Sequence, residues 1–470
     1  MKRFVTGQAR GQATLFAERL EDFIAEDNPV RVIDAFVEQL DLRALGFAAV
    51  EPKATGRPAF HPAVLLKLSI DGYLNRVQSS RRLGRECQRN VELMWLTERL
   101  TPEHKTIADV RKDNGQGLRG VCREFVELCR RLELFTQAVV AIDGSKFKAV
   151  NNRDKNFTPA KLKRRLEQID KSIARYLGEL DSADRAEPAV AEAKCAHLQE
   201  KIAALKEQMQ QLKALEPKLL AAPDQQLSLT DRDARSMKTR GNGIVGDNVQ
   251  IAVESTHHLI VSEAVTNVGS DRGQLARMAG QAREAIATKT LTAVADRGDC
   301  NGEQDGITSV LLKLQTSGNQ AEGLFGKRDF RYLPEEDAYQ CPGGERLPWR
   351  GSTQEHGQTY HRYWSSACSN CALKARCTTG KERRVTRWAH EAVLEAVQAR
   401  LDAEPETMRL HRQTVEHPFA TIKAWMGDTH FLTRTLPKVR TEMSLQGLAD
   451  NLRRVLNILG SGDLLEAVRA

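Results

Sequence analysis

The clearest periodicity in the chain is the spacing of apolar residues between positions 161 and 215. The apolar residues of the first half step mostly by four and three: Leu162, Leu166, Ile169, Ile173, Tyr176 and Leu180. A second run of the same kind extends from Cys195 to Leu212, beyond a polar stretch that reads DSADRAEPAV. This spacing predicts two helices that pack as a coiled-coil hairpin over 161–215. Because Cys195 occupies a core position of the second run, we interpret it as a packing residue.

A different helical pattern fills residues 1–135. The stretch HPAVLLKLSIDGYLNRVQSSRRLGRECQRNVELMWL has helical apolar spacing that breaks near Gln78, and either of the next two serines is a suitable cap for a helix from Arg81. Thr106 is a suitable cap for a further helix, IADVRKDN. Short basic helices in series favour a helical DNA-binding domain over 1–135. The alternative is a solvated basic face on a helical bundle, since charge alone is a weak signal.

Strand patterns appear after position 136. The run QAVVAID ends at Asp143 and is followed by a polar, basic loop, GSKFKAVNNRDKNFT. We interpret NVQIAVESTHHLIVSEAV as a β-hairpin, and a helix is predicted after it. A further strand pattern, TLTAVAD, ends at Asp296, and SVLLKLQ is another candidate strand. The last hundred residues are helical in pattern. This order predicts an α/β domain with a mixed sheet over 136–470, interrupted by the helical hairpin.

Composition narrows the class of protein. The chain has 470 residues, of which 41% are hydrophobic and 28% charged, and its net charge is +8 with a pI of about 9.0. These values suit a globular protein of two or three structural units and favour a polyanionic partner. The longest apolar runs are too short to cross a bilayer, and the N-terminus lacks the apolar segment of a signal peptide. We therefore expect no membrane association and a cytoplasmic location.

Three acids suggest a catalytic site. Asp143 and Asp296 each end an apolar strand pattern, and the carboxyl ends of strands are where α/β folds place ligand chemistry. Glu416 lies in HRQTVEHPFATIKAWMG, with Arg412 four residues before it and Lys423 seven after it, on one face of a helix. Converging carboxylates need positive charge to stay ionised, and oxygen ligands suit Mg²⁺. The bases would then grip phosphates, whereas the alternative is a surface ion-pair ladder.

The blocks AIDGSKFKAVNN, AVADRGDCNGE and RQTVEHPFATIKAWMGDTHFL carry a resemblance to the DDE-type transposases of bacterial insertion sequences. The resemblance implies an RNase H-like catalytic domain, with Asp143, Asp296 and Glu416 as the metal-binding triad. It also implies Mg²⁺ or Mn²⁺, two ions being expected, together with cleavage of double-stranded DNA at element ends and strand transfer to target DNA. Part of the family has a tyrosine-arginine-glutamate-lysine pattern, in which Arg409 takes the place of the tyrosine here.

The DNA contacts expected on these grounds come from basic residues near the three acids and in the N-terminal helices: Lys146, Lys148, Arg297, Arg412, Lys423, Arg81, Arg82 and Arg85. A transposase of this kind is expected to act as a homo-oligomer, a dimer, on its DNA. Two other functions fit the same residues. One is a DNA-binding protein derived from a transposase that has lost catalysis, and the other is a metal-dependent nuclease that cuts without joining.

Four cysteines fall in an expected insertion over 320–390, and they are Cys341, Cys368, Cys371 and Cys377. One C-x2-C pair with two outlying cysteines suits a tetrahedral zinc site, with His361 as a substitute ligand. The spacing is irregular for a zinc ribbon, so a loop with reduced thiols is the alternative.

Several positions depart from the resembling proteins. Asp299 and Cys300 stand where two aromatic residues are usual, and the segment after them is shorter by about two helical turns. Asp247 and Asp450 stand where tyrosines are expected. If these positions lie in the core, each aspartate places a carboxylate where an aromatic ring was, at a cost of several kcal/mol. We therefore expect a complete triad with weak or absent transposition.

Overall fold

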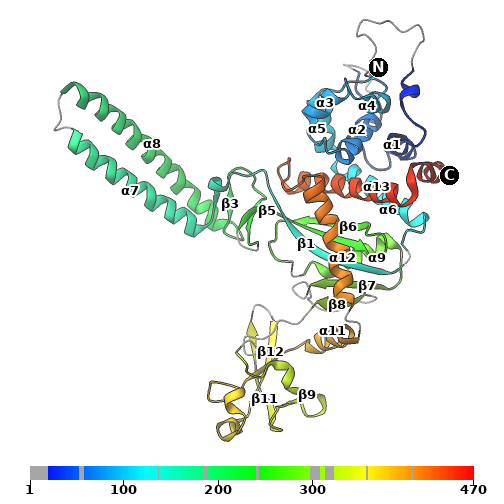
Figure 1. Cartoon of the computed structure of the whole chain (residues 1–470). Coiled ribbons are helices and arrows are strands. Elements are labelled where there is room, and N and C mark those ends of the chain that lie inside the picture. The colour runs from blue at the N-terminus through cyan, green and yellow to red at the C-terminus, as the bar shows by residue number, and fades with distance from the viewer. Residues whose placement is uncertain are drawn as a thin grey trace, which may run out of the picture.

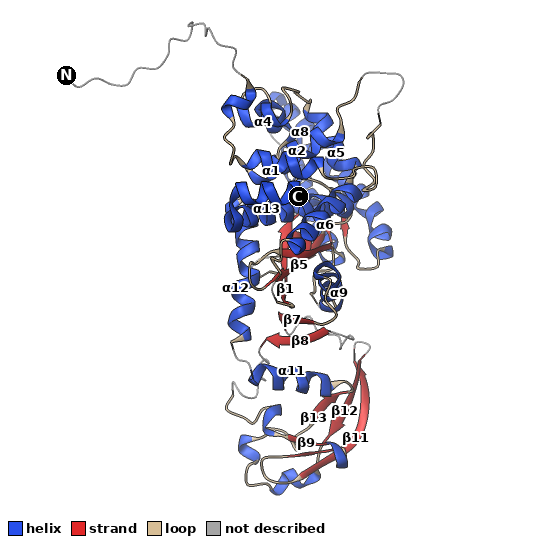
Figure 2. Ribbon diagram, turned by 90° about the vertical axis from the view of Figure 1, so that its right-hand side faces the viewer, coloured by secondary structure: helices blue, strands red, loops and turns tan. Residues whose placement is uncertain are grey.

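The computed structural model describes residues 19–51, 58–135, 137–183, 188–239, 243–271, 273–296, 307–312, 322–355, 358–403 and 406–470. Helices gather at one end, a mixed sheet lies in the middle, a second sheet lies at the far end, and a long helical hairpin projects sideways (Figure 1). Figure 2 shows the same succession of helical layer, central sheet and second sheet from the side. The predicted combination of a helical N-terminal region with an α/β part is confirmed.

The N-terminal region consists of short helices: η1 (Leu20–Phe23), α1 (Pro29–Glu38), α2 (Pro62–Leu74), α3 (Ser80–Glu86), α4 (Val91–Leu96), α5 (His104–Asp113) and α6 (Gly115–Arg131). Helix α1 starts where the Asn28 side chain accepts the N–H of Val30, and Pro29 fits the first turn. The prediction that Thr106 caps a helix was wrong, because α5 begins two residues earlier and Thr106 lies inside it.

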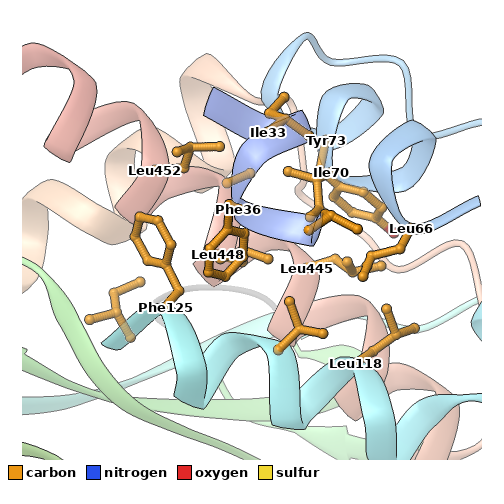
Figure 3. Packing of buried hydrophobic residues seen from close by; sticks show 14 of the residues in the cluster. Ile33, Phe36, Leu66, Ile70, Tyr73, Leu118, Phe125, Leu445, Leu448 and Leu452 are labelled. Atoms are coloured by element: carbon orange, nitrogen blue, oxygen red, sulfur yellow. The ribbon is translucent and has the colours of Figure 1, made fainter. Parts of the chain in front are cut away.

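The N-terminal helices share their core with the long helix α13 (Leu436–Arg469), which is kinked at Gly460. Figure 3 shows the buried side chains of α1, α2, α6 and α13 interlocking. The rings of Phe36 and Phe125 meet edge to face at 5.4 Å in the middle of this core. The N-terminal helices are therefore part of one continuous packing unit with the C-terminal helix.

The central sheet has six strands within the described residues: β1 (Val139–Lys148), β4 (Arg235–Met237), β5 (Ile244–Glu254), β6 (Ile260–Thr266), β7 (Leu291–Asp296) and β8 (Ile307–Leu312). Strands β4, β5, β1, β7 and β8 are neighbours in that order, and β6 pairs with β5. Strand β5 is antiparallel to β1, β4 and β6, whereas β7 is parallel to both β1 and β8. The mixed sheet is thus confirmed.

One part of the strand prediction was wrong. The chain after Asp143 does not leave the sheet as a loop, because β1 continues to Lys148 and pairs with β5 along residues 144–148. The polar sequence hid this continuation, because a glycine, a serine and two lysines accompany a single apolar residue, the buried Phe147. Pairing with the long strand β5 satisfies the backbone hydrogen bonds of these residues, so the strand forms here without alternating apolar side chains.

The two faces of the sheet pack against different helices. Val140 and Ile142 face helix α9 (Leu275–Ile286) together with Ala293 and Ala295 of β7. Residues of β1 and β5 on the opposite face, such as Phe147, join the core that contains α12 (Thr407–Ala420) and α13. This two-residue alternation decides which side chains of β1 can face a site on either side.

The predicted helical hairpin is present as α7 (Pro159–Ala183) and α8 (Pro188–Ala221), so its helices extend beyond the expected 161–215. Figure 1 shows the two helices side by side and antiparallel. At their base, β2 (Asn156–Phe157) pairs with β3 (Leu227–Ser228). Buried apolar residues seal the seam, among them Leu162, Ile169, Leu212 and Leu219.

Residues near 320–390 form a second antiparallel sheet that the sequence did not reveal. Its strands are β9 (Arg331–Leu333), β10 (Ala338–Gln340), β11 (Arg346–Glu355), β12 (Gln358–Tyr363) and β13 (Val385–Trp388), which are neighbours in that order. Three tyrosines, Tyr332, Tyr339 and Tyr363, pack their rings at centroid distances of 5.1–6.2 Å. Helix α11 (Glu391–Ala403) then leads the chain back toward α12.

Candidate active site

The register of two parallel strands brings together two positions that are far apart in the sequence. Ile142 of β1 lies opposite Ala295 of β7, so Asp143 and Asp296 are the next residues on neighbouring strands. Neighbouring strands are about 4.8 Å apart. The backbone of Asp296 also pairs with Leu312 of β8, while its side chain lies outside the described part of the structure. Asp296 stands at the carboxyl end of β7, as the sequence predicted. The prediction that Asp143 ends its strand was wrong, because β1 continues to Lys148 and only its pairing with β7 ends before Asp143.

The Asp143 carboxylate lies on the face of the sheet that α12 covers. Alternation along β1 puts Asp143 on the same face as Ser145 and Phe147, and the Phe147 ring meets that of Phe419 in α12 at 6.3 Å. Asp143 is half-buried, and its Oδ1 accepts the N–H of Gly144 at 2.7 Å. The carboxylate is therefore held at the boundary between sheet and solvent.

Glu416 comes from α12, whose buried face is fixed on β1. His411 is only 3% exposed, and its Nε2 donates to the carbonyl oxygen of Ile142 at 3.1 Å, directly beside Asp143. Val415 is buried, and the next residue, Glu416, is exposed at the edge of this face. Sequence reasoning missed His411, because a histidine within a helical pattern gives no signal of a contact with a distant strand.

Pro418 lies inside α12, two residues after Glu416. Proline has no N–H to donate to the preceding turn. The helix passes directly into a π-helical turn over Thr421–Trp425, which carries Lys423. Such π-turns are frequent at functional sites.

Lys423 reaches back from this turn to β1. Its Nζ donates to the hydroxyl of Ser145 and to the Lys146 carbonyl oxygen at 3.1 Å, and it lies 4.4 Å from the centre of the Phe147 ring. Burial lowers the pKa of Lys423, and the nearby Asp143 carboxylate opposes that effect. The ammonium group is thus held beside Asp143 by contacts within the protein.

The other predicted bases lie in different surroundings. Lys146 points to the opposite face of the sheet from Asp143, where its Nζ pairs with Asp271 at 2.8 Å. Asn248 and Gln250 donate to the same carboxylate. Lys148, at the end of β1, is exposed. The sequence could not reveal the Asp271 cluster, because its members come from separate strands and a loop.

The arginines predicted to contact DNA are exposed where the structure describes them. Arg81, Arg82 and Arg85 project from α3, and Arg82 approaches Glu86 at 3.8 Å. Arg412 is exposed on α12. Arg297 lies outside the described residues, as do Asp299, Cys300 and the shortened segment after them.

The four cysteines of the second sheet gather near one end of it. The sulfurs of Cys341 and Cys371 both lie 3.6 Å from the point where a Cβ on Gly343 would stand. Burial raises the pKa of the Cys377 thiol, Arg383 opposes this, and the three other thiols add to it. Even so, in the part of the chain that the structure describes, no three His, Cys, Asp or Glu side chains are grouped closely enough to hold a metal ion.

Asp247 and Asp450 are both buried, each with 1% exposure. Asp247 Oδ2 and Asp450 Oδ1 lack a hydrogen-bond partner, and burial raises the pKa of these carboxyls to about 7 and about 6. Arg454 Nε lies 3.4 Å from the other oxygen of Asp450. Both positions therefore lie in the core.

Comparison with protein families decides the identity. Residues 18–113 match a transposase domain family, DUF772, and residues 340–456 match a transposase DDE domain family. The chain belongs to the DDE-type transposases of insertion sequences. The second match includes Glu416, and the transposase assignment implies a DNA substrate. No curated protein and no solved structure matches the chain.

None of the helices within the described ranges is long and apolar enough to cross a membrane.

Proposed function

We propose that this transposase cuts double-stranded DNA at the ends of its element and joins the freed 3′-hydroxyl to target DNA, with the chemistry at Asp143, Asp296 and Glu416. The observation that carries the proposal is the register of β1 and β7, in which positions 143 and 296 follow the last paired residues of two parallel strands. Glu416 stands on the helix that covers the same face as Asp143.

The strand order supports an RNase H-like catalytic domain over 136–470. Three antiparallel strands, β6, β5 and β1, are followed across the sheet by β7 and β8, which run parallel to β1. We assign residues 1–135 as the DNA-binding domain, 161–215 as a coiled-coil insertion and 320–390 as a second insertion. The exposed Arg81, Arg82 and Arg85 support the first assignment.

The donor set suits a hard divalent cation, Mg²⁺ or Mn²⁺, because all three groups supply carboxylate oxygens. Asp143, Asp296 and Glu416 would hold the ions. When bound, such ions activate an attacking oxygen and stabilise a leaving one.

The chain's own residues prepare this site. His411 ties α12 to β1 beside Asp143, which sets where Glu416 stands. The Lys423 ammonium stands beside Asp143, where its positive charge offsets part of the repulsion among the acids. Arg412, exposed four residues before Glu416, is placed to bind a DNA phosphate by its forked donors. Chemistry of this kind depends mostly on positioning and charge stabilisation.

The test uses Asp143→Asn and Glu416→Gln in the full chain, with labelled DNA that carries the element ends. We expect both variants to lose Mg²⁺-dependent cleavage by at least about 100-fold, in line with the removal of one charge-stabilising group, while retaining DNA binding. Asp154→Asn, at an exposed aspartate of η2 (Arg153–Lys155), is the matched control. Full activity in either variant would remove that residue from the proposed site. Cleavage without joined products would favour the nuclease function.

A second candidate function, a transposase-derived DNA-binding protein with little catalysis, is favoured by the buried Asp247 and Asp450. The assay compares this chain with one in which tyrosines replace both aspartates, aromatic residues replace Asp299 and Cys300, and the missing turns are restored. Higher activity and a higher Tm in the restored chain would support decay. Equal values in the two chains would contradict it.

A further inference from the structure

Positive charge is concentrated at the base of the α7–α8 hairpin. The twelve residues from Lys155 to Leu166 contain five cations and no acid, and the cations are Lys155, Lys161, Lys163, Arg164 and Arg165. The rest of α7, residues 167–183, contains four acids and two cations. The charge of the helix therefore changes sign between its base and its outer part, which a merely solvated helix does not require.

Most of these basal cations are free to bind a ligand. Lys155, Lys163, Arg164 and Arg165 are exposed and form no ion pair with another described residue. By contrast, Arg175 in the outer part of α7 lies 3.7 Å from Glu179. Like charges three or four residues apart on a helix destabilise it slightly, and Arg164 and Arg165 stand at these distances from Lys161. A bound polyanion would offset this repulsion.

The basal cations stand on a rigid platform. Phe157 of β2 is buried with Leu162 and Leu219, which closes the seam between the two helices at their base. Strand β2 pairs with β3, and the Lys161 ammonium lies 5.7 Å from the centre of the Phe157 ring. Because the backbone here is fixed from both sides, binding phosphates requires the ordering of side chains alone.

The base of the hairpin follows β1 directly. From Asp143 the strand β1 continues for five residues to Lys148, and η2, β2 and α7 come next along the chain. Five residues of strand span about 16 Å, which is the length of about five base pairs. A duplex with its reacting phosphate at Asp143 and its axis along β1 would therefore pass the end of this strand, from which the chain continues into the hairpin, about five base pairs away.

We infer that the basal cations Lys155, Lys163, Arg164 and Arg165 bind the backbone phosphates of the double-stranded DNA that flanks the reacting phosphate. This inference rests on the proposed function, because it takes Asp143 as the site of reaction. Charge complementarity fits any polyanion, and the side chains around the cations decide between DNA and an acidic protein segment. The cluster carries no exposed aromatic residue between positions 155 and 166 that would anchor a protein partner, whereas a phosphate track needs only cations.

The experiment measures the salt dependence of DNA binding by the full chain. A triple variant, Lys163→Ala, Arg164→Ala and Arg165→Ala, is titrated against a labelled duplex with the element end between 50 and 200 mM NaCl. Each lost phosphate contact reduces the slope of log K against log salt by about 0.9, so three contacts reduce it by about 2.7. The natural chain should then lose about 40-fold more affinity than the variant over this range.

Two variants serve as controls. Lys171→Ala with Arg175→Ala, in the outer part of α7, should leave the slope unchanged. Lys163→Arg should also retain it, since the charge remains. Equal helix content by circular dichroism in all variants shows that the hairpin is folded. An unchanged slope in the triple variant would overturn the inference, as would an equal loss of slope in the outer variant.

Cleavage separates this inference from the proposed function. At saturating DNA the triple variant should cleave at the natural rate, because its acids are intact. Asp143→Asn should keep the natural salt slope and lose cleavage. If the triple variant shows the reduced salt slope but the natural chain cleaves no DNA, the result would support the contact between the hairpin and DNA and would contradict the proposed chemistry.

Discussion

Asp247→Asn should stabilise the protein at neutral pH. The Asp247 carboxylate lies in β5 opposite Phe147 of β1, is 1% exposed and has one oxygen without a hydrogen-bond partner. Burial raises its pKa from 3.8 to about 7, and the negative charges of Asp231 and Asp233 add to the rise while Arg235 opposes it. Asparagine has nearly the same shape and carries no charge at any pH.

The sign and size of the effect follow from this raised pKa. An acid whose pKa is higher in the folded than in the unfolded state favours folding when protonated, so its penalty is absent below the unfolded pKa. The penalty grows as the pH rises from about 4 and is complete above about 7. A rise of about three units corresponds to about 4 kcal/mol, a large part of the 5–15 kcal/mol of typical domain stability.

The assay is urea unfolding of the natural chain and of Asp247→Asn at pH 4.5, 6 and 8. We expect the two midpoints to be nearly equal at pH 4.5 and to separate progressively, with the variant more stable at pH 8. An exposed aspartate on α7, Asp170, provides the control Asp170→Asn, which should follow the natural chain at every pH. Two parallel profiles that never separate would show that Asp247 carries no buried charge and would refute the reasoning.

Three other outcomes can be checked. Trp425→Leu should lower stability by about 1–3 kcal/mol in a thermal melt, since the indole lies between Arg76 at 3.7 Å and Arg453 at 3.1 Å and loses two cation–π contacts. Gly246→Ala should lower the Tm strongly, because its Cβ would stand 1.9 Å from a backbone carbonyl oxygen of β1 and force the strands apart. If the four cysteines bind zinc, metal analysis should find about one zinc per chain, lost in Cys371→Ser; a metal-free protein with an intact fold would favour reduced thiols instead.

Much of the architecture could be predicted because it depends on local periodicity. The helical hairpin repeats apolar residues over two long runs, and the apolar runs that precede Asp143 and Asp296 form neighbouring strands. The second sheet escaped prediction for a related reason. Its strands β9, β10 and β13 have only three or four residues, and the small core of the sheet depends on tyrosines such as Tyr339 and Tyr363, whose spacing follows no simple period.

The contacts around the candidate site could be predicted only in part. The apolar runs before the two aspartates indicated that both lie on strands. The partners of the neighbouring lysines, however, depend on the sheet register and on the face that each residue takes. Lys146 and Lys148 looked alike in the sequence, yet one is paired with Asp271 and the other is exposed. Likewise, the contact of Lys423 with Ser145 crosses between segments whose approach no local pattern encodes.

The candidate site and the N-terminal helices are connected by one continuous buried core. Residues of the sheet such as Phe147 and residues of α2 such as Leu66 belong to the same buried core, with α13 between them. The π-turn that carries Lys423 ends at Trp425, which is held by Arg76 at the end of α2. A displacement of α3, which carries the exposed arginines, would therefore be transmitted through packed side chains to the contact of Lys423 with Ser145, because close-packed cores transmit strain. DNA held by α3 would thus be positioned relative to Asp143 by the fold itself, without a flexible linker between binding and chemistry.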